Sequence, residues 1–161
     1  MSVYTRSDAC GAAATWAKWL GKKQEDLRGT AVYGDPGVIQ AVQKDVRGIG
    51  LNNIGFAYDT KTLKPNAGIV VLPIDINNNG KIDPNENFYG DQKQLAKAIA
   101  GGKYPSPPAR NLYFVTNSKP KDPAVVAFLK YVLTTGQKNI AGQGFIPIGK
   151  DKAAEEQKQL K

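Results

Sequence analysis

Near its N-terminus the chain reads Tyr4-Thr5-Arg6-Ser7-Asp8-Ala9-Cys10-Gly11-Ala12. The residues before Arg6 favour a short β-strand, and the apolar spacing that follows predicts a helix that Asp8 caps and Gly21 ends. A strand that turns directly into a helix aims free backbone N–H groups and the positive end of the helix dipole at one point. The stretch therefore predicts a β-turn-α unit that suits an anion, to which Arg6 could add a charge-assisted grip. An ordinary capped helix beside a surface arginine is the alternative.

The same alternation of strand and helix signals continues along the chain. Residues 30–33 are predicted to form a strand, and Asp35 before a proline is typical of a helix start. Residues 48–51 and 68–74 are expected to be further strands, the second an apolar run of the kind buried on both faces of a sheet. Asp91 is expected to start another helix. These elements predict an α/β fold with a mostly parallel sheet flanked by helices.

A proline-rich connector at residues 104–110 is the candidate domain boundary. Beyond it, residues 112–116 are predicted to form a strand, and Asp122 followed by Pro123 predicts an amphipathic helix through Thr135. The tail, residues 150–161, is charged and nearly free of apolar side chains, so we expect it to fray.

Composition excludes several functional classes. The 161 residues carry 22 Lys and Arg against 14 Asp and Glu, a net charge of +8 that favours anionic partners. The lysines are scattered and no basic run occurs, which argues against nucleic-acid binding. With no histidine and with Cys10 as the single cysteine, no intrachain disulfide, Cys/His metal site or histidine-based catalysis is possible. The sequence has no signal-peptide pattern and no long apolar run, and we expect no enzymatic activity.

Several passages together resemble one family. The stretch from Tyr4 to Ala12 is similar to the Thr-Arg-Ser-Asp-x-Ser-Gly-Thr passage of phosphate-binding solute-binding proteins of ABC importers, which have the type II periplasmic binding protein fold. Tyr33-Gly34-Asp35-Pro36-Gly37, Gly48-Ile49-Gly50 and Gly144-Phe145-Ile146-Pro147-Ile148 resemble later passages of the same family. The resemblance covers roughly residues 3–148. It implies an extracytoplasmic protein that works with the membrane subunits of an importer.

The resemblance also implies a set of ligand residues. The family's ligand arginine falls on Arg6, and its Ser-Gly-Thr falls on Cys10, Gly11 and Ala12, so two hydroxyl donors are absent here. Phosphate is the expected ligand, with another tetrahedral oxyanion as the alternative. The expected anion-binding residues are Arg6, Ser7, Asp8, Cys10, Gly11 and Ala12.

The family has two lobes, and the chain visits the first, crosses to the second and returns. On this resemblance, residues 3–105 form the second, ligand-binding lobe, residues 110–149 form the returning segment of the first lobe, and residues 150–161 form the charged tail. The partner strands of the returning segment do not occur in this chain. We therefore expect a homo-oligomer in which another copy covers this segment, and weak anion binding by the chain alone.

A second motif lies at Asp75-Ile76-Asn77-Asn78-Asn79-Gly80-Lys81-Ile82-Asp83-Pro84-Asn85-Glu86. It matches the twelve-residue calcium loop at each diagnostic position, with Gly80 at the sharp turn. The preceding residues are strand-like, so the motif predicts an isolated EF-hand-like loop with structural Ca²⁺ rather than a paired EF-hand. A metal-free Asn/Gly-rich surface turn is the alternative. The rival function for the whole chain is a stand-alone calcium-binding interaction module without anion binding. The expected ligands are Asp75, Asn77, Asn79, the backbone carbonyl of Lys81, Asp83 through water, and Glu86.

Overall fold

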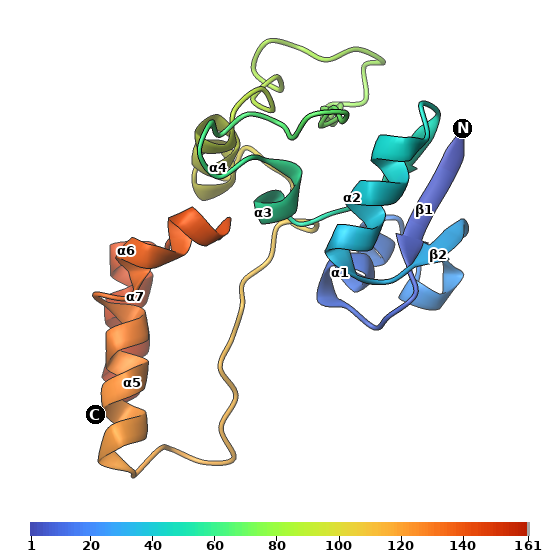
Figure 1. Cartoon of the computed structure of the whole chain (residues 1–161). Helices are drawn as coiled ribbons and strands as arrows, with labels where there is room; N and C mark the ends of the chain where they lie inside the picture. The colour runs from blue at the N-terminus through green and yellow to red at the C-terminus, as the bar shows by residue number, and fades with distance from the viewer. Residues whose placement is uncertain (161) are drawn as a thin grey trace. The chain divides into compact units, whose positions relative to one another are not determined.

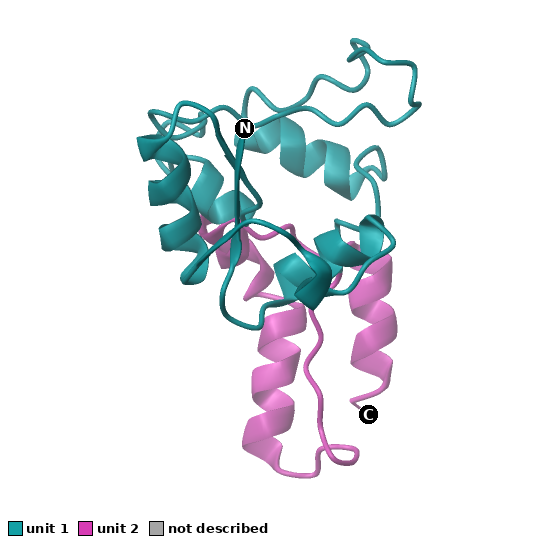
Figure 2. Ribbon diagram, turned by 90° about the vertical axis from the view of Figure 1, so that its right-hand side faces the viewer, with its two compact units in different colours: residues 1–110 teal, residues 111–161 magenta. Residues whose placement is uncertain are grey.

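The computed structural model describes residues 1–160 and divides into two compact units, Met1–Arg110 and Asn111–Lys161, called unit 1 and unit 2 below. Figure 2 colours them separately. The boundary between the units lies at the end of the proline-rich connector.

Unit 1 is built on a three-stranded parallel sheet. The central strand β1 (Ser2–Arg6) lies between β2 (Thr30–Val32) and β3 (Gly48–Gly50), in the order β2-β1-β3. Helix α1 (Gly11–Trp19) and the short 3₁₀ helix η1 (Gln24–Asp26) connect β1 to β2, and α2 (Gly34–Lys44) connects β2 to β3 (Figure 1). Parallel strands joined through helices confirm the predicted α/β class. Because β1 and β2 run in the same direction, the loops after Arg6 and after Val32 leave the same edge of the sheet.

The predicted strand over residues 68–74 is wrong. These residues have no strand structure, and Val70 is 79% and Leu72 58% exposed. Gly68 has a φ of +80°, and Pro73 has no N–H to donate to a neighbouring strand. An apolar run becomes a buried strand only where partner strands pair with it, and no strand within residues 1–160 pairs with this segment.

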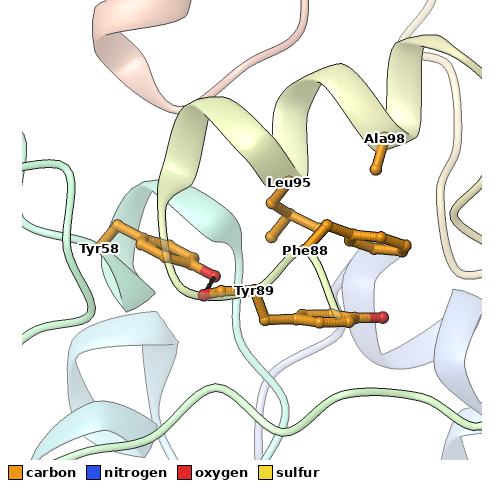
Figure 3. Packing of buried hydrophobic residues seen from close by; sticks show 5 residues of the cluster. All are labelled: Tyr58, Phe88, Tyr89, Leu95 and Ala98. Atoms are coloured by element: carbon orange, nitrogen blue, oxygen red, sulfur yellow. Dashed lines mark hydrogen bonds between the residues drawn. The ribbon is translucent and has the colours of Figure 1, made fainter. Parts of the chain in front are cut away.

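A cluster of aromatic side chains forms a second packing centre in unit 1. Tyr58 follows α3 (Ile54–Ala57), and its hydroxyl donates to the carbonyl oxygen of Tyr89 at 2.6 Å. The rings of Phe88 and Tyr89 stack with centroids 4.7 Å apart. Leu95 and Ala98 of α4 (Gln92–Ala100) close the cluster (Figure 3). Asp91 caps α4 by accepting from the N–H of Lys93, as predicted.

Replacing Tyr58 by phenylalanine is expected to lower the free energy of unfolding by about 1–2 kcal/mol, because the buried carbonyl of Tyr89 loses its donor while the ring is retained. Tyr58 is only 1% exposed, so water has no access to replace the hydroxyl. Urea titration monitored by circular dichroism measures the difference. Tyr33→Phe is the matched control, since Tyr33 is exposed and its substitution should change little. Equal effects of the two substitutions would contradict this account of the cluster.

Unit 2 is helical. Helix α5 (Pro123–Leu133) begins where predicted, with the Asp122 carboxylate accepting from the N–H groups of Ala124 and Val125. Helix α6 (Gln137–Ile140) and the 3₁₀ helix η2 (Ala141–Gln143) follow it. Within residues 1–160, no helix is long and apolar enough to cross a membrane.

Two predictions for unit 2 are wrong. Residues 112–116 form no strand, and the side chains of residues 112–115 are exposed, because no neighbouring strand pairs with them. The tail does not fray: α7 covers Lys150–Lys158 and packs against α5, with Ala153 buried. Alanine, glutamate, glutamine and lysine are good helix formers, and the small Ala153 permits close packing. Lys161, the last residue of the predicted tail, lies outside the described residues.

Candidate functional site

The C-terminal end of β1 places Arg6 within an ion-pair network. Its Nε donates to Asp8 Oδ1 at 2.8 Å and its Nη2 to Asp8 Oδ2, which is a two-pronged pair. Its Nη1 lies 2.9 Å from Asp35 Oδ1, near the start of α2. The Arg6 side chain is only 8% exposed. The hydrogen bonds to Asp8 raise the pKa of Arg6, and the Arg6 guanidinium in turn holds the pKa of Asp8 well below its usual range.

Asp8 does not cap α1 as predicted, because its carboxylate is engaged elsewhere. Besides the two bonds from Arg6, Asp8 Oδ1 accepts from the backbone N–H of Gly34 at 3.1 Å, in the first turn of α2. This helix begins at Gly34, with Tyr33 as its N-cap, two residues before the predicted start with Asp35 as the cap and Pro36 as the first helical residue. Asp8 therefore joins the loop after β1 to the loop after β2.

Cys10 is the N-cap of α1. Its Sγ accepts from the N–H of Ala13 at 3.3 Å, in the position where a serine or aspartate oxygen usually lies. Gln24 fixes the loop from the other side, accepting from the N–H of Cys10 and donating to the carbonyl of Asp8 at 2.8 Å. No acceptor within residues 1–160 takes the N–H groups of Gly11 or Ala12. The first turn of α1 thus has two free donors beside a fixed loop.

The loop from Asp75 to Glu86 closes on its own carboxylates. Asp75 accepts from the N–H groups of Asn79 at 3.2 Å and Gly80 at 2.8 Å. Glu86 is 3% exposed and accepts three backbone N–H groups, from Ile76 and Asn77 on one oxygen and from Asp83 on the other. Within residues 1–160, no three Asp, Glu or Cys side chains gather closely enough to hold a metal ion by themselves. A cation in this loop would also need amide and backbone carbonyl oxygens.

Both ends of this loop are attached to the aromatic cluster. Tyr89 lies three residues after Glu86, and its hydroxyl accepts from the N–H of Ile74, one residue before the loop, at 3.4 Å. A change in the conformation of the loop would therefore alter the packing of Tyr89.

Comparison with known proteins identifies a family. A family model described as a PBP superfamily domain matches residues 1–135. The chain belongs to this family. No curated protein and no solved structure matches this PBP domain. Membership gives it a general role in solute binding of the periplasmic-binding-protein kind, in a family that is generally non-enzymatic and typically extracytoplasmic.

The residues predicted for anion binding in this PBP domain lie along one loop and the first turn of α1. Arg6 and Asp8 face each other, so the edge of the guanidinium that would grip two oxygens of an anion is occupied by Asp8. Ser7 is exposed, and its N–H donates to the carbonyl of Val32. Cys10, Gly11 and Ala12 form the cap and the first turn, as described above.

Sequence reasoning missed three residues near this loop. Gln24 and Asp35 hold it from neighbouring elements, and Arg110, the last residue of unit 1, lies against Gly11. Asp35 was recognised only as a helix-start signal, and Arg110 only as the end of the connector. No local pattern in the sequence links either of them to Arg6 or Gly11.

Changing Asp8 to asparagine is expected to lower the melting temperature at pH 7, and the deficit should shrink below about pH 4. The pKa of Asp8 is lower in the folded state, so its contribution is complete above the unfolded pKa and is lost as the pH falls towards the folded value. Thermal unfolding of both proteins at pH 7 and pH 3 measures this. Asp45 and Asp59 also have lowered pKa values, but both proteins keep them, so their effects cancel in the comparison. A deficit that does not change with pH would contradict the assignment.

Proposed function

We propose that this PBP domain binds phosphate, or a related tetrahedral oxyanion, at the N-terminus of α1. The observation that supports this most is that no acceptor within residues 1–160 takes the N–H groups of Gly11 and Ala12, in the helix turn that follows the Arg6 loop. Helix N-termini favour anions through free N–H groups and the helix dipole. A guanidinium has five N–H groups. Asp8 takes two of those of Arg6 and Asp35 faces a third, so two remain for a ligand.

The wider role that we infer is the solute-binding component of an ABC importer. In this proposal unit 1 belongs to the second lobe and unit 2 to the returning part of the first lobe. The exposed apolar side chains of residues 112–115 are then surface that first-lobe strands, or a second copy of the chain, would cover. Because one wall of a two-lobed cleft supplies only part of the donors, we expect the chain alone to bind phosphate with roughly millimolar affinity.

Calcium has a separate, structural place in this proposal. The loop from Asp75 to Glu86 would hold Ca²⁺ through Asp75, Asn77, Asn79, the Lys81 carbonyl, Asp83 through water, and Glu86. The full ligand spacing supports this, as does the turn in which Asp75 accepts from Asn79 and Gly80. The loop also connects to the aromatic cluster, so a bound cation would stabilise unit 1.

Calorimetry of the full chain separates this function from the rival calcium module. Phosphate and sulfate are titrated at low ionic strength, with and without millimolar calcium. The proposal expects saturable anion heat that weakens as chloride is added, because the site is open to solvent. Calcium binding with no response to either anion would favour the calcium module instead.

A further inference from the structure

Arg110 lies against the first residue of α1 in unit 1. A methyl group on Gly11 would lie 2.6 Å from Arg110 Nη2 and 2.8 Å from its Cζ, so a side chain at this position would make the guanidinium move away. The turn before Arg110 is fixed, with the N–H of Ala109 donating to the Pro105 carbonyl at 3.0 Å and the Ser106 hydroxyl to the Ala109 carbonyl at 2.8 Å. The guanidinium therefore lies beside the free donors of Gly11 and Ala12.

This position is unfavourable for a cation on its own. The N-terminus of a helix carries partial positive charge, which repels a guanidinium. No acceptor within residues 1–160 pairs with Arg110. Arg6, by contrast, faces two carboxylates.

The charges near the loop show what Arg110 contributes. Arg6 with Asp8 and Asp35 carries one positive and two negative charges, a net charge of −1 that would repel an anion. Arg110 brings this set to neutrality, and it is the member of the set whose N–H groups are not already taken by a carboxylate.

We propose that Arg110 is the second guanidinium ligand of the anion, and that Gly11 is glycine so that this guanidinium can reach it. This inference rests on the proposed function, because it adds a residue to the same site. Arg6 then mainly holds the loop in place, and the exposed guanidinium of Arg110 donates two parallel hydrogen bonds to two oxygens of phosphate.

The test follows the amide signals of Gly11 and Ala12 by two-dimensional NMR of the ¹⁵N-labelled full chain. Inorganic phosphate is titrated at constant ionic strength, balanced with chloride. The variants are Arg110→Ala, Arg110→Lys, Gly11→Ala and the charge-matched control Arg47→Ala. Arg47 precedes β3 at the opposite edge of the sheet, since its neighbour Gly48 pairs with Ser2 at the start of β1.

Arg110→Ala is expected to weaken phosphate binding about tenfold, and Arg110→Lys about threefold, since lysine keeps the charge but not the fork. Gly11→Ala should weaken binding although the net charge is unchanged, because the methyl group displaces the guanidinium. Arg47→Ala should stay within about twofold of the unmodified chain. Melting temperatures of the Arg110 variants should match that of the unmodified chain, because Arg110 is exposed and has no hydrogen-bond or ion-pair partner within residues 1–160.

Two outcomes overturn the inference and can be told apart. If the unmodified chain binds phosphate at Gly11 and Ala12 but Arg110→Ala binds no more weakly than Arg47→Ala, Arg110 is not a ligand and the proposed function stands. If phosphate moves neither amide signal in the unmodified chain, the proposed function fails and the inference fails with it.

Discussion

Replacing Arg6 by alanine is expected to abolish phosphate binding and to destabilise unit 1 in the same protein. Removal of the guanidinium leaves the carboxylates of Asp8 and Asp35 without a cationic partner. The two negative charges repel phosphate, and the loop between β1 and α1 loses the side chain that holds it in place. Losing the hydrogen bonds between these charged groups lowers the free energy of unfolding by on the order of 2 kcal/mol.

Urea unfolding and phosphate titration of the same samples measure both effects. Arg47→Ala, with the same change of charge, should alter neither by much. Arg6→Lys should recover part of the stability but little of the binding, because an ammonium group cannot keep the two-pronged pair with Asp8 and also reach Asp35. An Arg6→Ala protein that binds phosphate as the unmodified chain does would contradict the role of Arg6 in the site.

Glu86→Gln is expected to lower stability without calcium and to remove the response to calcium. One carboxylate oxygen becomes an NH₂ group that faces a backbone N–H, so at least one buried donor loses its acceptor, at a cost of about 1–3 kcal/mol. The substitution also removes the ligand that would bind Ca²⁺ through both oxygens. The unmodified chain should gain about 1.4 kcal/mol of stability at a calcium concentration ten times its Kd, which we expect between about 10⁻⁵ and 10⁻³ M.

Melting temperatures in EDTA and in millimolar calcium separate these two effects. Glu25→Gln is the matched control, because Glu25 is exposed in η1, outside the loop. A melting temperature of the unmodified chain that is the same in EDTA and in calcium would show that the loop is the metal-free turn. In that case Glu86 stabilises it only through the three backbone N–H groups that it accepts.

Local signals predicted the parts of the fold that depend on neighbouring residues. The β1-turn-α1 unit follows from a β-prone segment and a helix start within nine residues. Asp122 before Pro123 fixed the start of α5, and Asp91 that of α4. The apolar runs at residues 68–74 and 112–116 could not be assigned in this way, because a strand needs a partner and partners are chosen at long range. The helix of the tail was missed although its residues are good helix formers, because its packing against α5 is also a tertiary effect.

In the candidate site too, contacts between residues close in the sequence were predictable and long-range contacts were not. Arg6 and Asp8 are two residues apart, and their pairing follows from a loop that the motif already indicates. Cys10, and not the predicted Asp8, caps α1. The Asp8 carboxylate instead accepts a hydrogen bond from the N–H of Gly34, which is distant in the sequence. The contacts of Asp35 with Arg6 and of Arg110 with Gly11 join segments about 30 and 100 residues apart, which no periodicity or spacing can bring together.

The central claim is that phosphate binds at the first turn of α1, and the amide signals of Gly11 and Ala12 test it most directly. Both N–H groups lack an acceptor within the described chain, so a bound oxyanion should shift them downfield with a saturable dependence on phosphate concentration. The account predicts this shift at roughly millimolar phosphate, and a weaker one as ionic strength rises. Signals of Gly11 and Ala12 that stay unmoved up to tens of millimolar phosphate would contradict it.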